Sequence, residues 1–266
     1  PVIGPGGPPV INNPPDIEPL MKVKPDVLFT SLLDASKADR LQDKIRIPVV
    51  VLSYGDFASF DDTVFDSLRL LGRIFKKDGR AEEVVGFVRG KIADLKRRAA
   101  KTKGKPSVYV GALGFKGTQG IESTDASYVP FEWLSANNAA KEISPSGHLF
   151  INMETLLKLD PEIIFIDGGG REAVSRDFAR KREIYNQLEA FRERRVYALF
   201  PFNWYTTNIG TALADAYAIG KAVSPGAFRD IDIRSVTNDI YSFLVGEPLY
   251  DEMAADYGQP GQKISF

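Results

Sequence analysis

The sequence contains no cysteine, one histidine (His148) and three methionines among its 266 residues. The absence of cysteine excludes disulfide bonds, a thiolate nucleophile and a cysteine-based zinc site. With so few imidazole and thioether groups, a site for a bare transition metal is hard to assemble. We therefore expect no intrinsic metal or cofactor, and a bound ligand either brings its own chelating groups or contains no metal.

An excess of charge of one sign is also lacking, because 34 basic side chains stand against 35 acidic ones. A protein that neutralises many phosphates usually has a basic excess, so we expect no nucleic-acid partner. No apolar run approaches the ~18 residues of a membrane span. Residues 1–9 do not resemble a signal peptide, which a mature or truncated chain would also lack, so the compartment stays open.

The most informative feature that is present is an internal repeat. Residues 16–29 (DIEPLMKVKPDVLF) match residues 152–165 (NMETLLKLDPEIIF) almost in register. Each copy has Asp or Asn as a helix N-cap, a short helix, a proline that closes it and a β-branched, apolar strand. The match indicates that a structural unit has been duplicated.

Each copy is followed by a charged helical stretch and a second strand. These segments are 35–44 and 48–53 in the first half, and 177–194 and 195–200 in the second half. The order helix, strand, helix, strand in both halves predicts an α/β protein with two Rossmann-like lobes, each built on a parallel sheet.

One strong helix is predicted between the two copies, over about residues 79–101. At ~1.5 Å per residue it is long enough to bridge two lobes, although an ordinary surface helix would show the same pattern. We divide the chain into a first lobe (1–78), a linker helix (79–103) and a second lobe (104–266). The apolar residues that share one face of this helix are Ala81, Val84, Val85, Val88, Ile92, Leu95 and Ala99.

These segments resemble a known family, the periplasmic binding proteins of ABC importers for iron–siderophore complexes, haem and cobalamin. The resemblance rests on 17–29, the helix from Ala81, 153–165 and the ending 230–252. It implies a monomeric, extracytoplasmic protein without enzymatic activity, which captures an iron(III) chelate, haem or a corrinoid between its lobes. The partner would be an ABC permease dimer in the membrane.

Family members usually have a further strand and helix before the segment that corresponds to residues 2–4. The resemblance therefore implies an incomplete first lobe. A lipid anchor, where the family has one, would lie in an N-terminal segment absent from this sequence.

Aromatic residues are frequent in the loops that follow the predicted strands. Ligands of open parallel sheets bind beyond the carboxyl ends of the strands. These loops are 4–13 and 53–57 in the first lobe and 111–133, 167–170 and 201–208 in the second. Aromatic pocket walls suit a large, partly apolar organic ligand. The candidate ligand-binding residues are Tyr54, Phe57, Phe115, Lys116, Gln119, Tyr128, Phe131, Trp204, Tyr205 and Asn208.

Several of these residues have a second interpretation. Trp204 and Tyr205 either contact the ligand or anchor their own loop, and Lys116 either pairs with an anionic chelate or is solvated. Tyr54 or Tyr128 could ligate iron as phenolate, but a tyrosine at a cleft edge is more often a hydrogen-bond donor, so no metal ligand is assigned. The lone His148 is more often structural.

Two further features bear on the alternatives. Gly168-Gly169-Gly170 matches neither the dinucleotide fingerprint nor a Walker motif, and is better explained as a permissive turn. The main alternative function is a two-lobed Rossmann-like enzyme, such as a nucleotide-sugar transferase or a chelatase. It would need a phosphate loop or an acid–base pair, and neither is visible. A ligand sensor with the same fold is a third possibility.

Glu18 and Glu154 occupy the same position in the two repeats, in the first turn of the predicted helices. The helix dipole alone favours a carboxylate there. In the family that the sequence resembles, one glutamate at this position on each lobe docks into arginines of the permease. The resemblance therefore implies a docking role for this pair.

Overall fold

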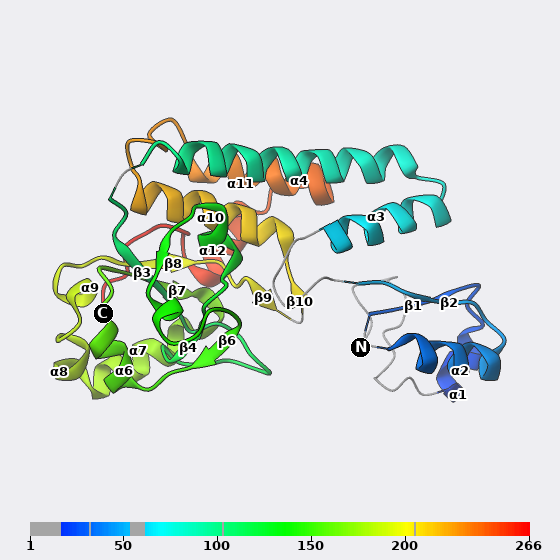
Figure 1. Ribbon diagram of the computed structural model, residues 1–266, viewed down its shortest axis with the longest axis horizontal. Helices are drawn as coiled ribbons and strands as arrows, with labels where there is room; N and C mark the ends of the chain where they lie inside the picture. Colours follow the sequence, from blue (N-terminus) through cyan, green and yellow to red (C-terminus); the bar gives the residue numbers. More distant parts are fainter. Residues whose placement is uncertain (1–16, 32, 54–61, 103, 205) are drawn as a thin grey trace.

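The computed structural model describes residues 17–31, 33–53, 62–102, 104–204 and 206–266. In the first lobe, the strands β1 (Leu28–Thr30) and β2 (Val49–Val51) pair in parallel, with Leu28 opposite Val49. The helices α1 (Ile17–Val23) and α2 (Ala35–Ile45) precede these strands. Asp34 caps α2, because its side chain accepts the Lys37 N–H at 2.8 Å. Figure 1 shows this lobe in blue, apart from the rest of the chain.

The second lobe contains a four-stranded parallel sheet in the order β5-β3-β7-β8. Side chains alternate between its two faces, so Val108 and Val110 of β3 lie in one apolar cluster and Tyr109 in the other. One face is covered by α5, α10 and α4, and the other by α6 to α9. The bounds are β3 (Ser107–Gly111), β5 (Asn137–Asn138), β7 (Ile163–Asp167), β8 (Val196–Leu199), α5 (Val129–Trp133), α6 (Met153–Leu159), α7 (Arg171–Arg180), α8 (Arg182–Tyr185), α9 (Glu189–Arg192) and α10 (Ile209–Val223).

The second lobe also contains two short strand pairs and several further helices. Two strands, β4 (Ser123–Asp125) and β6 (His148–Phe150), pair in antiparallel fashion, and so do β9 (Asn203–Trp204) and β10 (Thr206–Thr207). The remaining elements are η1 (Ala139–Glu142), η2 (Gly168–Gly170), α11 (Ile233–Val245) and α12 (Tyr250–Tyr257).

The duplicated helix–strand unit is confirmed. The first copy forms α1 and β1, and the second forms α6 and β7. Asn152 caps α6 as predicted, with its side chain accepting the Thr155 N–H at 2.8 Å. In the second lobe this unit feeds the central strand of the sheet, where all five residues of β7 are buried.

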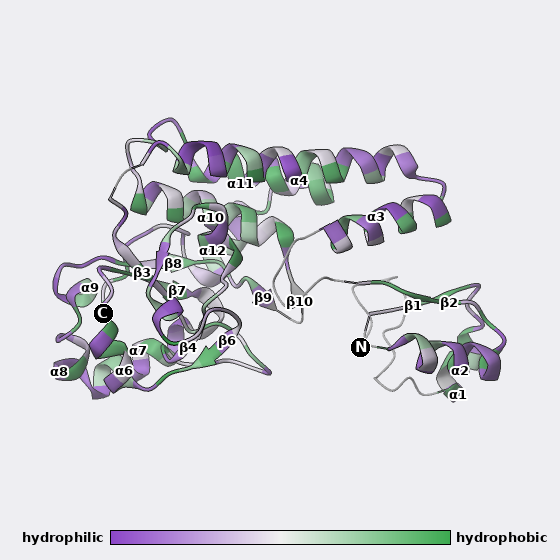
Figure 2. Cartoon of the chain, viewed as in Figure 1, coloured by the Kyte–Doolittle hydropathy of each residue, from purple (hydrophilic) through white to green (hydrophobic). Residues whose placement is uncertain are grey.

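The helix predicted between the copies is confirmed as α4 (Asp78–Ala99). Its predicted apolar face is the buried one, with Val88 and Leu95 fully enclosed. It packs on α10 and on the antiparallel helix α3 (Asp62–Ile74), which an Arg69–Glu82 ion pair of 2.8 Å ties to it. Figure 2 shows the hydrophilic outer side of α4 above the more apolar α10. Among the described residues, no helix is long and apolar enough to span a membrane.

Candidate ligand-binding surface

Three loops of the second lobe meet at the carboxyl ends of β3, β7 and β8, and we name this region the carboxyl-edge surface. A Cβ added to Gly170 would lie 2.6 Å from Ala112 Cβ and 2.5 Å from Gln119 O. A Cβ on Gly168 would lie 2.9 Å from Leu199 O. Glycine is therefore required here for close contact between loops, as predicted for a turn rather than a phosphate loop.

The loop after β3 is stiffened by its own hydrogen bonds. Gln119 Nε2 donates to Phe115 O at 2.8 Å, and Asn203 Nδ2 donates to Gly114 O at 3.1 Å. The Gln119 side chain therefore holds the loop that presents Phe115, and the Asn203 bond joins this loop to the one after β8. Gln119 thus has a structural role in addition to the contact predicted for it.

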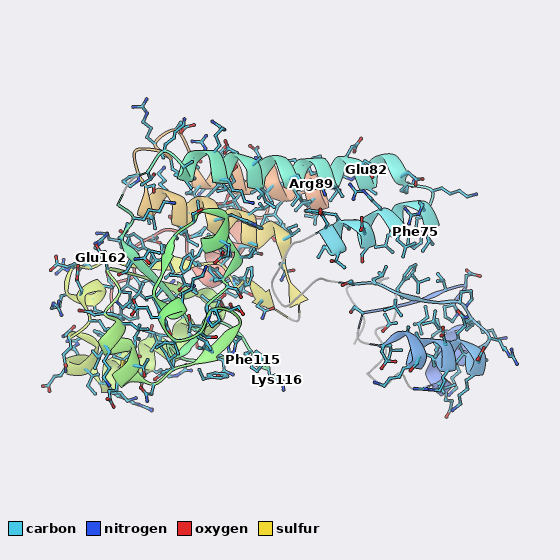
Figure 3. All side chains as sticks on the ribbon, in the orientation of Figure 1. Phe75, Glu82, Arg89, Phe115, Lys116 and Glu162 are labelled. Atoms are coloured by element: carbon cyan, nitrogen blue, oxygen red, sulfur yellow. The ribbon has the colours of Figure 1, made fainter. Side chains whose placement is uncertain are left out.

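An aromatic cluster formed by Phe115, His148 and Phe150 lies beside this loop. The Phe115 ring stacks on the His148 ring with centroids 4.2 Å apart, and Phe150 meets His148 edge-on at 4.8 Å. Phe150 is 58% exposed, and Lys116 Nζ lies 5.6 Å from the Phe115 centroid. In Figure 3, Phe115 and Lys116 project from the side of the second lobe nearer the first lobe in this view. The cluster thus offers an accessible aromatic face beside a cation.

His148 holds the aromatic cluster together. Its Nε2 lies 2.9 Å from Ser123 Oγ, which fixes the ring against Phe115. Burial lowers the pKa of His148 and the buried Asp125 carboxyl partly offsets that effect, so the ring is neutral at pH 7. The sequence favoured a structural role for His148 but did not predict its place beside Phe115, because the pairing of β4 with β6 has no local signal.

Two predicted pocket residues are corrected by the structure. Tyr128 and Phe131 are each 1% exposed and pack edge-to-face at 5.0 Å inside the core. Phe202, which follows β8, packs on the same Tyr128 ring at 5.0 Å. The cause is α5, which lies under α4 and α10 and carries its aromatic residues inward. Burial also raises the pKa of Tyr128 well above its usual value, which opposes a phenolate ligand for iron.

The other candidates are distributed as follows. Tyr54, Phe57, Tyr205 and the loop 4–13 lie outside the described residues. The backbone of Trp204 belongs to β9, and Asn208 is exposed directly before α10. In the part of the chain that the structure describes, no group of three or more His, Cys, Asp or Glu side chains could hold a metal ion.

Glu18 and Glu154 have matching surroundings on the two lobes. Each lies in the first turn of its helix and pairs with a lysine one turn later, Glu18 with Lys22 at 2.9 Å and Glu154 with Lys158 at 2.8 Å. The two carboxylates are 78% and 75% exposed. The repeat therefore places equivalent, accessible carboxylates on both lobes.

The two-lobed α/β fold with one long helix is that of the substrate-binding proteins of ABC importers. The chain belongs to the periplasmic binding protein family, whose model matches residues 12–201. The members of this family are binding proteins of ABC transporters and not enzymes, which decides against the enzyme alternative. They are periplasmic or extracytoplasmic.

Two characterised relatives are distant in sequence. The molybdate-binding protein MolA of Haemophilus influenzae is 23% identical over 86% of this chain and 69% of its own length. The Fe(3+)-citrate-binding protein YfmC of Bacillus subtilis is 22% identical over 69% of this chain and 56% of its own length. A periplasmic solute-binding protein from Veillonella parvula shares the fold, with a TM-score of 0.72, 21% identity, and coverage of 91% of this chain and 73% of its own.

Proposed function

We propose that this protein captures a metal complex between its two lobes and delivers it to an ABC permease. The ligand classes proposed are an iron(III) chelate, haem or a corrinoid. The observation that carries the proposal is the aromatic cluster of Phe115, His148 and Phe150, with the Lys116 cation beside it. A partly apolar ligand packs on such a face, and a lysine favours negative charge on the ligand. The relatives MolA, a molybdate-binding protein, and YfmC, an Fe(3+)-citrate-binding protein, are consistent with a metal-containing ligand.

The ligand proposal is tested by native mass spectrometry and an absorption spectrum of protein purified from its source. We expect a co-purifying metal complex in wild-type protein, and its loss in the Phe115→Ala and Phe150→Ala variants. Phe75→Ala is the matched control, because Phe75 is also exposed (56%) but follows α3. A co-purifying nucleotide or nucleotide sugar would overturn the proposal, and so would full retention of the complex by Phe115→Ala.

Delivery to the permease is proposed to depend on Glu18 and Glu154. Their equal exposure and equal position on the two lobes suit a partner made of two similar subunits. Exposed carboxylates that meet arginines of a partner contribute charge-assisted hydrogen bonds. We propose that the protein acts as a monomer on such a permease dimer, and that a lipid anchor, where one exists, holds it near the membrane.

The docking proposal is tested with the double variant Glu18→Gln/Glu154→Gln in an import assay. We expect import to fall at least tenfold while ligand affinity stays unchanged. Glu83→Gln is the control, because Glu83 is an exposed glutamate (65%) that pairs with Arg80 on α4. Unchanged import in the double variant would contradict docking through these residues. It would favour a sensor that reports its ligand to a membrane partner.

A further inference from the structure

A cavity of about 450 Å³ lies at the carboxyl-edge surface, beside the end of β7. Gly168, the first residue after β7, forms part of its wall, and a Cβ on Gly168 would lie 2.9 Å from Tyr257 Cβ of α12. The cavity therefore belongs to the edge of the sheet at which ligands of α/β folds bind. Its lining residues are Gly168, Arg171, Glu172, Ser175, Arg176, Asp256 and Tyr257.

Arg171 is held in place at this cavity. Its Nη1 donates to the Tyr257 carbonyl oxygen at 3.3 Å, and the side chain is half-buried. A Cβ on Gly258, which has a φ of 87°, would overlap Arg171 Nη1. Only glycine at position 258 therefore leaves room for the arginine to lie across the backbone after α12.

The guanidinium of Arg171 has donors left over. Among the described residues no carboxylate forms an ion pair with Arg171, whereas Arg176 in the same cavity pairs with Glu172 at 3.2 Å. A guanidinium carries five N–H donors in a planar fork. One donor binds the Tyr257 carbonyl, so the others are available to a ligand.

We infer that this cavity is an anion subsite, in which Arg171 binds carboxylate or oxyanion oxygens of the captured ligand. The inference rests on the proposed function and narrows its ligand to a metal complex that bears negatively charged oxygen atoms. A fixed, planar guanidinium binds two such oxygens side by side. A chelate with free carboxylates and a metal oxyanion share this chemistry.

The charges around the cavity give the subsite a signature that can be measured. The exposed Asp256 opposes an anion, and solvent screens its repulsion. Removal of the Asp256 charge should therefore tighten binding of an anion slightly, and removal of the Arg171 charge should weaken it strongly. A purely structural role for Arg171 would not produce these opposite changes.

The test is calorimetric titration of the whole protein with iron(III) citrate, with molybdate and with cyanocobalamin, a metal complex whose net charge is zero. Arg171→Ala should weaken binding of an anionic probe roughly 10- to 100-fold. The affinity of Arg171→Lys should lie between those of wild type and Arg171→Ala. Asp256→Asn should tighten binding about two- to fivefold. Arg180→Ala, an exposed arginine at the other end of α7, is the control and should bind as wild type does.

A second pair of variants guards against misfolding of the arginine variants. Gly258→Ala should displace Arg171 and reduce anion binding. Gly246→Ala adds a Cβ at a similar φ of 92° into open space, and its anion binding should be unchanged. It controls for a positive φ alone, because ψ is −2° at Gly246 and 164° at Gly258, where an alanine is strained more. Equal anion binding by Gly258→Ala and Gly246→Ala would overturn the inference.

The remaining outcomes separate the subsite from the proposed function. Anion binding by Arg171→Ala with wild-type affinity would overturn the subsite alone. Binding of cyanocobalamin together with no binding of either anion would also overturn the subsite, and would leave the proposed function standing. Wild-type protein that binds none of the three probes would overturn the subsite, whereas a co-purifying nucleotide or nucleotide sugar would overturn the proposed function and the subsite together.

Discussion

The buried carboxyl of Asp215 accepts the backbone N–H of Phe200 at 3.0 Å, one residue beyond the end of β8. A second buried carboxyl, that of Asp167, accepts the N–H of Phe202 at 3.0 Å. Both acids lie within the second lobe and are 0% and 2% exposed. They fix the start of the loop that continues into β9 and β10, and so they position part of the carboxyl-edge surface from the interior of the lobe.

Asp215 is expected to act as a neutral acid. Burial raises its pKa well above the usual value, which favours the protonated form. Asp215→Asn keeps the shape and the acceptor for Phe200, and should change the free energy of unfolding by less than about 1 kcal/mol. Asp215→Ala removes the acceptor and should cost about 1–3 kcal/mol. Urea unfolding at pH 7 measures both free-energy changes. An equal loss of stability in the two variants would contradict a protonated Asp215.

Asp167 predicts a pH dependence of stability. Burial raises its pKa to about 7, against the lowering effect of the N–H groups of Phe202 and Gly169. Between about pH 4 and pH 7 the folded state holds the proton and the unfolded state has lost it. The contribution of Asp167 to the free energy of unfolding is thus fully present below pH 4. It falls as pH rises, by at most about 1.4 kcal/mol per pH unit, until about pH 7.

Asp167→Asn isolates that contribution. The variant cannot lose a proton at this position, but its amide offers one oxygen where the carboxyl offers two, so one N–H is left without its acceptor. We expect it to be less stable than wild type at pH 5 and to approach or exceed wild type at pH 8. Urea unfolding at four pH values between 5 and 8 gives the comparison, and parallel curves would refute the raised pKa.

The repeat and the linker helix were predictable because their signals are local. The Asn152 cap and the prolines before β1 and β7 act within a few residues of the elements they delimit. The apolar face of α4 follows from helical spacing alone, and packing against α10 then buries it. The resemblance to periplasmic binding proteins was recognised from the order of these units along the chain.

The binding surface was predicted less well because its residues are joined by tertiary contacts. Phe115 and Lys116 were predicted from their place after a strand. His148 reaches Phe115 only through the antiparallel pairing of β4 with β6, and two-residue to three-residue strands leave little trace in a sequence. Arg171 was missed for a similar reason, because its partner Tyr257 lies 86 residues away.

The correction at Phe131 has a testable consequence. Its ring is enclosed against Tyr128 and against Phe165 of β7, at 5.0 and 5.9 Å between centroids. Phe131→Ala should therefore cost about 3–5 kcal/mol of unfolding free energy through the cavity it leaves. Ligand affinity of the protein that remains folded should not change. A loss of affinity without a loss of stability would restore the pocket-wall interpretation.

The attachment of α4 to the second lobe depends on Arg98. Its guanidinium binds both carboxylate oxygens of Asp230, at 2.7 and 2.9 Å, and its Nε donates to Asp94 at 2.8 Å. Arg98 is 14% exposed, and its hydrogen bonds hold the pKa of Asp230 down at about 2. For such an acid, the stabilisation is present above about pH 4 and is lost as pH falls through 2.

Arg98→Ala should lower the free energy of unfolding at pH 7 by about 1–3 kcal/mol, since a charge-assisted, two-pronged pair is lost. The neighbouring Arg97 is 61% exposed, and Arg97→Ala should change stability by less than about 0.5 kcal/mol. In an Asp230→Asn background the effect of Arg98→Ala should shrink, because the partner charge is already absent. Thermal unfolding of the four members of this cycle measures the coupling. Strictly additive effects would show that Arg98 acts through its contacts with Asp94, the Ala227 carbonyl oxygen and the Phe228 ring, and not through Asp230.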